Sequence, residues 1–328
     1  MPLAPIVLPS NRPAGRFYRG GRRITDLRGD PPAASHEPED WIASTTHVFG
    51  QPGLGETVLP DGTPLRVAVE VDPVGWLGEA HVAAFGADTK LLTKLLDAGQ
   101  RLPVHAHPDG AFAHDHLDHA HGKTEAWVIL QPGTVHLGLR RAVAEEELRG
   151  LVDTQSTAEL LDLLHAIRVE AGDAVLVAAG QLHAIGEGVL LLEVQEPEDL
   201  SILLEWDGFD LDGTVDGHLG LGFDRALQAV SREPLDPEQA GLVTRATTSG
   251  PVLPAAAEPF FRVDRVPVTG PQHLDPGFAV VLVERGTVRL GDLDLHRGAT
   301  VVVPAGAGQV PVSGDGALLV SRPPRCIS

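Results

Sequence analysis

Two segments far apart in the chain repeat one pattern of glycines and apolar residues. Residues 172–180 (Gly-Asp-Ala-Val-Leu-Val-Ala-Ala-Gly) align without gaps with residues 298–306 (Gly-Ala-Thr-Val-Val-Val-Pro-Ala-Gly). Short apolar runs that are rich in β-branched residues and bounded by glycine are typical of buried strands that end in tight turns. The repeat therefore indicates that one β-unit occurs twice. Two unrelated strand-turns of similar composition are the alternative.

The other apolar runs are also short, which indicates a mainly β chain. The 328 residues include 37 glycines and 27 prolines, and turns separate most of the apolar runs. This spacing is typical of β-sandwiches and β-barrels. We expect a segment over residues 1–62 that packs on a first barrel over 63–233, then a linker over 234–258 and a second barrel over 259–328.

Helical patterns interrupt the first barrel. Residues 142–151 contain three consecutive glutamates, and residues 156–166 begin with Ser156 and Glu159 at the spacing of a capping box. These two stretches predict a small helical insertion between strands. A further helix is expected over residues 223–230.

The region before residue 100 is harder to assign from its pattern. Alternation predicts strands over residues 65–71 and 80–85. The leucines of residues 91–96 have helical spacing behind Asp88, a possible N-cap, so their pattern favours a helix.

Three histidines and a glutamate have the spacing of a metal site. His105 and His107 are two residues apart, so on an extended strand both imidazoles leave the same face. Glu125 lies where a loop enters a second apolar strand, and His183 follows the first copy of the repeat. Three imidazoles and a carboxylate suit a divalent first-row metal and leave coordination positions open for substrate or water. The second copy of the repeat has Gln309 where the first has His183, which predicts a second barrel without metal.

Other histidines in the chain have a simpler explanation. The chain has 15 histidines, so some pairs at this spacing arise without any metal. His114, His116, His119 and His121 alternate with aspartates, which is typical of a solvated loop with adventitious metal binding.

Charge and composition exclude several classes of partner. The formal net charge of −20 argues against nucleic acids and anionic membranes. No apolar run reaches the roughly 18 residues that span a bilayer. The single cysteine, Cys326, allows no intrachain disulfide and fits a reducing compartment, so we expect a cytoplasmic protein.

Basic residues are concentrated in 12–30, and the only lysines are Lys90, Lys94 and Lys123. Nothing in the sequence specifies an oligomeric state.

Several motifs resemble the cupin superfamily and, within it, the short bacterial form of the type I mannose-6-phosphate isomerase family. The resemblance runs from about Trp41 to the C-terminus, and its most specific pieces are Leu95-Leu96-Asp97-Ala98, Val104-His105-Ala106-His107-Pro108-Asp109, Gly122-Lys123-Thr124-Glu125-Ala126-Trp127, His183-Ala184-Ile185-Gly186-Glu187-Gly188 and Glu193-Val194-Gln195. It implies two cupin-type β-barrels of the jelly-roll class and a strand, not a helix, over 91–96.

The resemblance also implies roles for individual residues. His107, Glu125 and His183 would hold one divalent ion, zinc first and Mn, Fe, Co or Ni as alternatives. His105 stands where the family has glutamine, which moves the site towards the three-histidine, one-glutamate set of other cupins. Lys123 matches a lysine that the family places near the substrate phosphate, and Glu193 matches an acidic candidate for proton transfer. The implied ligand is a small sugar or sugar phosphate, and the implied activity is aldose–ketose isomerisation.

One departure from the family bears on activity. Ile202 falls where the family has an active-site arginine, and no arginine or lysine lies between Arg168 and Arg225. We therefore expect weak turnover of mannose 6-phosphate, partly restored by Ile202→Arg. Two alternatives stay open: another cupin enzyme, acting on an unphosphorylated sugar or as an oxygen-dependent oxidase, and a sugar-binding protein without turnover.

Overall fold

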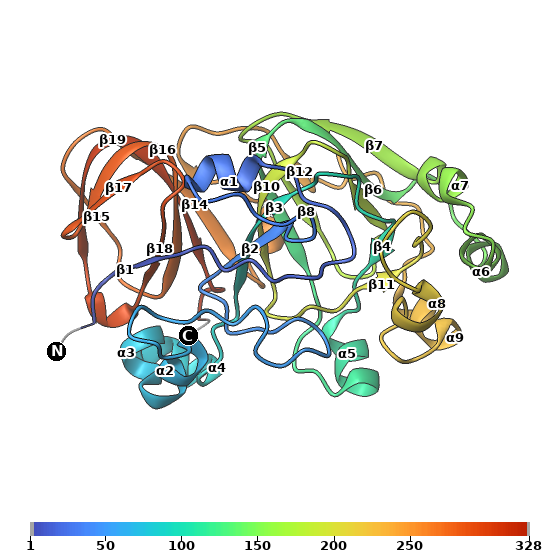
Figure 1. Cartoon of the computed structure of the whole chain (residues 1–328), viewed down its shortest axis with the longest axis horizontal. Coiled ribbons are helices and arrows are strands. Elements are labelled where there is room, and N and C mark those ends of the chain that lie inside the picture. The colour runs from blue at the N-terminus through green and yellow to red at the C-terminus, as the bar shows by residue number, and fades with distance from the viewer. Residues whose placement is uncertain (1–2, 327–328) are drawn as a thin grey trace.

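The two repeat segments form β8 (Ala174–Val177) and β18 (Thr300–Val303), one in each of two β-barrels. The computed structural model describes residues 3–326 and places the first barrel beside the second, which is orange to red in Figure 1. The mainly β architecture expected from the sequence is confirmed. The domain boundaries themselves stay a prediction.

Two antiparallel sheets form the first barrel. The six-stranded sheet has the order β12 (Val243–Thr244), β8, β5 (Glu125–Gln131), β10 (Leu190–Gln195), β3 (Leu92–Asp97), β2 (Glu39–Ile42). The five-stranded sheet has the order β11 (Ile202–Leu203), β4 (His105–Ala106), β9 (His183–Ile185), β6 (Gly133–Leu139), β7 (Leu164–Val169). Their facing side chains form one core that includes Trp127 and Ile129 from the first sheet and Leu137 and Ile185 from the second. Burial of this apolar surface holds the two sheets together.

A single eight-stranded sheet forms the second barrel. Its order is β1 (Ile6–Leu8), β18, β16 (Ala279–Leu290), β19 (Val310–Arg322), β14 (Arg262–Val268), β13 (Gly250–Pro251), with β15 (Gln272–Leu274) paired to β19 and β17 (Leu293–His296) paired to β16. The N-terminal strand β1 pairs with β18, whereas β2 extends the first barrel. The N-terminal segment thus contacts both barrels.

Short helices surround the barrels. They are α1 (Arg23–Arg28), α2 (Leu65–Val71), α3 (Pro73–Leu77), α4 (Glu79–Phe85), α5 (Gly110–Leu117), α6 (Glu145–Asp153), α7 (Thr157–Asp162), α8 (Gly213–Asp216) and α9 (Phe223–Ala226), with the 3-10 turns η1 (Leu227–Ala229), η2 (Ala255–Ala257) and η3 (Ala305–Ala307). The expected helical insertion is present as α6 and α7, although α7 ends at Asp162 and residues 164–169 form β7. Residues 223–229 are helical, in α9 and η1, so the helix expected over 223–230 is present but one residue shorter.

The strands expected over 65–71 and 80–85 are wrong, because both segments are helices. In α2 the buried side chains are Leu65 and Val69, one turn apart, while Val71 is 79% exposed. Burial therefore follows the helical period and not the alternation of a strand. Segment 79–85 is rich in alanine and lies between Gly78 and Gly86, which favours a short helix.

The pattern of residues 91–96 was misleading in the opposite direction. Every residue of β3 is buried, because the strand lies inside the six-stranded sheet between β10 and β2. The polar side chains of Thr93 and Lys94 are buried as well as the leucines, so the spacing of the leucines alone does not distinguish this strand from a buried helix. The strand implied by the family resemblance is confirmed.

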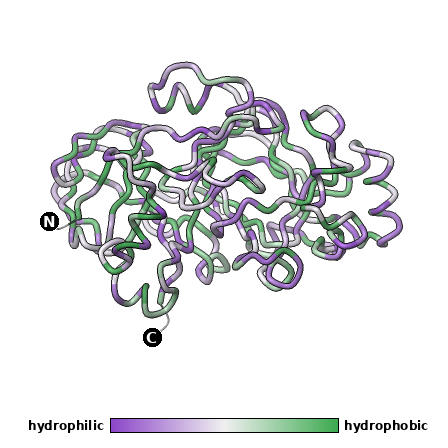
Figure 2. The backbone as a smooth tube through the Cα atoms, turned by 60° about the horizontal axis from the view of Figure 1, so that its bottom comes forward, coloured by the Kyte–Doolittle hydropathy of each residue, from purple (hydrophilic) through white to green (hydrophobic). Residues whose placement is uncertain are grey.

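Figure 2 shows hydrophobic residues along many of the strands inside both barrels and hydrophilic residues in the surrounding loops and helices.

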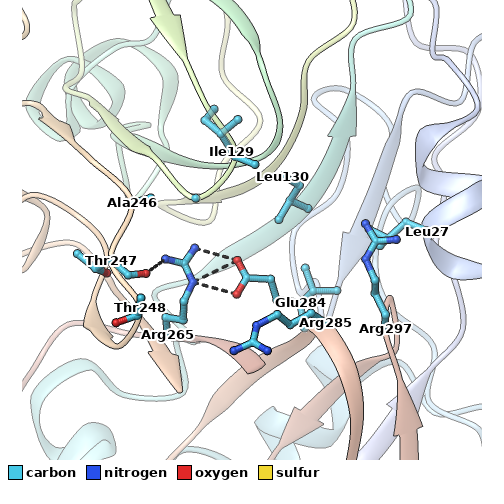
Figure 3. A pocket seen from close by; sticks show the side chains of 13 residues that line it. Leu27, Ile129, Leu130, Ala246, Thr247, Thr248, Arg265, Glu284, Arg285 and Arg297 are labelled. Carbon is cyan, nitrogen blue, oxygen red and sulfur yellow. Dashed lines mark hydrogen bonds and ion pairs between the residues drawn. The ribbon is translucent and has the colours of Figure 1, made fainter. Parts of the chain in front are cut away.

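A cavity of about 340 Å³ lies between the barrels, lined by Ile129 and Leu130 of the first and by Glu284 and Arg285 of the second. There Arg265 binds Glu284 and the carbonyl of Thr247 (Figure 3). Within residues 3–326, no helix is long and apolar enough to cross a membrane.

Candidate active site

Three buried imidazoles meet in the first barrel. His105 in β4 pairs in register with His183 in β9, and the centroids of the two rings lie 4.0 Å apart. His107 follows β4, and one potential ligand atom from each of the three rings lies within 4.8 Å of the others. In the described part of the chain, this is the only group of three or more histidine, cysteine or acidic side chains with that geometry. The structure therefore brings together the three histidines singled out in the sequence.

Each imidazole is oriented by a main-chain carbonyl. The Nδ1 atoms of His105, His107 and His183 lie 2.8, 2.6 and 2.9 Å from the carbonyl oxygens of Pro103, Leu200 and Gln181. A carbonyl only accepts, so Nδ1 carries the proton in each ring and Nε2 keeps its lone pair. This outer arrangement is the one that fixes the tautomer of metal-binding histidines.

Burial disfavours the charged forms of His105 and His107. It lowers the pKa of His105 well below its ordinary value, with the neighbouring His183 acting in the same direction. Burial, together with the charge of Lys123, lowers the pKa of His107 to about 3. Neutral imidazoles are the form that binds a metal ion at neutral pH.

Glu125 adds a carboxylate to the cluster. Its Oε2 and Oε1 atoms lie 3.1 Å from Nε2 of His107 and 3.4 Å from Nε2 of His183, and Nε1 of Trp127 donates to Oε1 at 3.0 Å. Neither Oε2 of Glu125 nor Nε2 of His183 takes part in a well-directed hydrogen bond, although both atoms are fully buried. Unsatisfied buried lone pairs are unfavourable, and a bound cation would satisfy them. The donor set therefore fits a divalent metal.

Lys123 approaches the same ligands from the loop before β5. Its Nζ atom lies 2.8 Å from Nε2 of His107 and 2.8 Å from Oε2 of Glu125. Gly122 makes this close approach possible, because a Cβ there would lie 2.5 Å from the carbonyl carbon of Asp109. Burial would raise the pKa of Glu125, but Lys123 and His107 outweigh it and lower that pKa well below its usual value.

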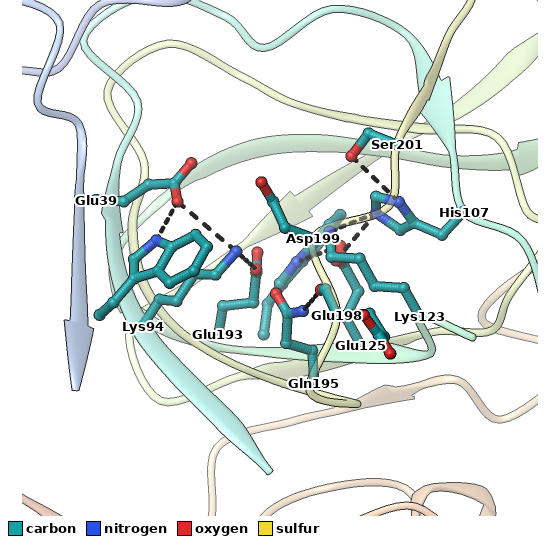
Figure 4. A network of polar contacts seen from close by, with 12 residues as sticks. Glu39, Lys94, His107, Lys123, Glu125, Glu193, Gln195, Glu198, Asp199 and Ser201 are labelled. Carbon is teal, nitrogen blue, oxygen red and sulfur yellow. Dashed lines mark hydrogen bonds and ion pairs between the residues drawn. The ribbon is translucent and has the colours of Figure 1, made fainter. Parts of the chain in front are cut away.

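A second polar network lies beside the cluster (Figure 4). Lys94 lies between two carboxylates, with Nζ 3.4 Å from Oε1 of Glu193 and 3.6 Å from Oε2 of Glu39. All three side chains are almost fully buried, and they line one cavity with His105 and Glu125. Burial raises the pKa of Glu193, and the charge of Glu125 raises it further. The carboxylate of Glu193 is thus more basic than an exposed one, and it lines the same cavity as His105.

Comparison with known proteins places this geometry in a family. No protein-family model matches the sequence. A mannose-6-phosphate isomerase from Streptococcus mutans is 30% identical over 272 residues, which cover 77% of this chain and 82% of that protein. The chain belongs to the mannose-6-phosphate isomerase family. A mannose-6-phosphate isomerase from Bacillus subtilis is 37% identical over 128 residues, covering 38% of this chain and 40% of that protein.

Solved structures agree with this family's fold. A crystal structure of the mannose 6-phosphate isomerase from Bacillus subtilis superposes with a TM-score of 0.70 at 22% identity, covering 98% of this chain and 100% of that one. A variant of the phosphomannose isomerase from Salmonella typhimurium gives a TM-score of 0.74 at 16% identity, with coverages of 98% and 100%. The cupin-type fold expected from the sequence is confirmed.

Ile202 does not occupy the active site of this mannose-6-phosphate isomerase family member. It lies opposite Ala106 in the β11–β4 pair, is fully buried, and packs in the apolar cluster that includes Val104. Its neighbours Ser201 and Leu203 line the cavities instead. Because alternate strand residues point to opposite faces, the side chain at position 202 points away from these cavities, and the weak turnover expected from the lack of an arginine there loses its structural reason.

The histidines of 114–121 do not form a metal site in the described residues. His114 and His116 are exposed on α5, whereas His119 contacts Glu198 at 2.7 Å and His121 contacts Asp88 at 2.6 Å.

Sequence reasoning missed Arg16, Glu39 and Lys94 as members of the site. The available signal for Lys94 was its position inside the run Leu91-Leu92-Thr93-Lys94-Leu95-Leu96, where an unpaired lysine would be expensive to bury.

Proposed function

We propose that this chain is a metal-dependent isomerase that interconverts mannose 6-phosphate and fructose 6-phosphate. His105, His107, Glu125 and His183 would hold one divalent ion, and zinc fits a set of neutral imidazoles and a carboxylate. The observation that carries the proposal is the buried three-histidine cluster, with one proton on each Nδ1 and the carboxylate of Glu125 beside it. Membership of the mannose-6-phosphate isomerase family supports the choice of substrate.

When bound, the ion would supply a Lewis acid that polarises the substrate oxygens at C1 and C2. Glu193 takes the proton from C2 of the aldose and returns it to C1, while the hydroxyl proton on O2 passes to O1, so that the carbonyl moves from C1 to C2. A buried carboxylate with a raised pKa is suited to this task, because it holds a proton more readily than an exposed one. Lys94 keeps Glu193 in place and stabilises its charged form.

The direct test is conversion of mannose 6-phosphate to fructose 6-phosphate by the zinc-loaded protein, with the metal-stripped protein as its control. We expect a turnover number in the ordinary range of about 1–10³ per second, and its loss on stripping. Folded, zinc-loaded protein that binds the sugar phosphate without converting it would instead select a binding protein. Oxygen uptake with a redox metal would select an oxidase. The cytoplasmic location expected from the sequence fits a phosphorylated substrate and stays a prediction.

A further inference from the structure

Arg16 lies in the N-terminal segment between β1 and α1, and its side chain lines the active-site cavity of the first barrel. Its side chain is 11% exposed, and its Nη1 and Nη2 atoms lie 3.2 and 3.4 Å from the carboxylate oxygens of Asp199. Its Nε atom lies 3.3 Å from Oε1 of Glu39. Burial alone would lower the pKa of Arg16, but Asp199 and Glu39 outweigh it and raise that pKa. The segment therefore delivers a permanent positive charge to the site.

The guanidinium of Arg16 has donors to spare. A guanidinium carries five N–H groups. The two hydrogen bonds that Arg16 makes from its side chain both go to Asp199, and both are long. Its buried Nε takes part in no well-directed hydrogen bond. The remaining N–H groups on Nη1 and Nη2 can therefore donate to a second anion, such as a phosphate or carboxylate group.

Arg16 lies where two cavities meet. It lines the inner cavity together with His105, Lys123 and Glu193. It also lines an outer cavity of about 500 Å³, whose other lining residues include Asp210 and Asp216 and no second lysine or arginine. An anionic group that enters through the outer cavity meets Arg16 as its first cation.

The other two cations of the inner cavity lie against the proposed base and the histidine cluster. Lys94 lies between Glu39 and Glu193, and Lys123 contacts Glu125 and His107 in the histidine cluster. Neither reaches the outer cavity. In a chain with a net charge of −20, a dianionic ligand requires a local cation.

We propose that Arg16 binds the phosphate group of the substrate at the junction of the two cavities, while the reacting carbons lie at the histidine cluster. The inference rests on the proposed function and names the anion subsite of that site. It assigns to the N-terminal segment the positive charge that Ile202 does not supply from the barrel. Asp199 acts as a positioning residue, because it holds the guanidinium and is itself fixed by the main-chain N–H of Phe49 at 3.2 Å.

The test compares Arg16→Ala with Arg19→Ala in the full-length, zinc-loaded protein. Arg19 lies in the same segment and has the same charge, but its side chain is exposed and binds Gln100 outside both cavities. Calorimetry with inorganic phosphate measures the subsite without turnover. Because a hydrogen-bonded charge pair contributes about 1.5–3 kcal/mol, Arg16→Ala should weaken phosphate binding by about 10- to 100-fold, and Arg19→Ala by less than about twofold.

Arg16→Lys keeps the positive charge but lacks the planar guanidinium group with its several donors. Its affinity for phosphate should therefore lie between those of the wild type and Arg16→Ala. If Arg16→Ala does not fold, the phosphate affinity of Arg16→Lys is compared with that of the wild type instead. In kinetics, Arg16→Ala should raise KM for mannose 6-phosphate by a larger factor than it raises KM for unphosphorylated mannose. A purely structural ion pair would lower the melting temperature of the variant without changing its phosphate affinity, and this result would overturn the proposal.

The two proposals fail separately. If the wild type binds inorganic phosphate through Arg16 but does not isomerise mannose 6-phosphate, the anion subsite stands and the proposed function is refuted. If the wild type isomerises mannose 6-phosphate and folded Arg16→Ala and Arg16→Lys bind inorganic phosphate as tightly as it does, only the role of Arg16 is refuted.

Discussion

The ammonium nitrogen of Lys123 lies 2.8 Å from the Oε2 atom of Glu125, one of the two buried atoms of the three histidines and Glu125 without a well-directed hydrogen bond. The same nitrogen lies 2.8 Å from Nε2 of His107. A divalent ion bound to Glu125 and His107 would lie close to this ammonium group, and two positive charges so close together repel strongly in a buried site. Lys123 and a divalent ion therefore compete for the same lone pairs, and metal binding would move the ammonium group away from them.

This competition makes a prediction for Lys123→Met. The variant should retain its metal and bind zinc at least as tightly as the wild type, because the competing ammonium group is gone. Its kcat/KM for mannose 6-phosphate should fall by about 10- to 100-fold if the displaced lysine contacts the substrate. Zinc titration and steady-state kinetics measure the two effects. Lys90→Met, which removes a lysine outside the cavity, should change neither, and weaker zinc binding in Lys123→Met would contradict the competition.

The metal ligands make a second prediction. His107→Ala or His183→Ala removes one of four proposed donors, so zinc affinity should fall by more than about tenfold while the barrel core stays intact. Metal analysis after dialysis and circular dichroism measure the two properties. His114→Ala provides the matched control, because this exposed side chain lies outside the cluster. Full zinc stoichiometry in both ligand variants would remove the site from consideration.

The pair formed by Lys94 and Glu193 makes a prediction about pH. Glu193 must be ionised to take a proton, and burial raises its pKa above the ordinary 4.5. The rate should therefore fall as the pH decreases through that raised pKa. The charge of Lys94 counteracts the rise, so Lys94→Met should move the acid limb of the kcat/KM profile to higher pH.

Two further variants control this interpretation. Glu193→Gln should lose most activity and keep its zinc, because Glu193 is not among the proposed ligands. Lys94→Met also leaves the buried carboxylate of Glu193 without its cation, whereas Glu39 keeps Arg16, so a loss of about 3–5 kcal/mol in the free energy of unfolding is expected. An acid limb that stays in place in folded Lys94→Met would show that Glu193 does not titrate in the rate-determining step.

The sequence was informative where chemistry requires a fixed spacing. His105 and His107 lie on one face only if the chain is extended there, and the structure has a strand at that position. The repeat likewise identified β8 and β18, because a glycine-bounded apolar run has few alternative structures. In contrast, the partners of Lys94 come from β2 and β10, and no local pattern specifies which strands become neighbours.

Local patterns also failed where tertiary burial decided the structure. The α2 segment alternates in sequence but buries Leu65 and Val69 on one helical face. The role of Arg16 was hidden for a different reason, since Arg16 and Asp199 are 183 residues apart and meet only in the folded chain. A search for a replacement cation close to Ile202 in sequence therefore could not find it.

The orientation of Ile202 makes the last prediction. Its side chain is fully buried in an apolar cluster, so Ile202→Arg would place an unpaired guanidinium there. The expected loss is at least about 3 kcal/mol in the free energy of unfolding, whereas Ile202→Val should lose only about 0.5–1.5 kcal/mol. Urea unfolding of both variants measures the difference. Isomerase activity should not rise in Ile202→Arg, because the new side chain points away from the cavity that Ser201 lines. A variant with wild-type stability and increased turnover would mean that position 202 faces the substrate. In that variant, Arg16 would be only one of two cations that contact the substrate.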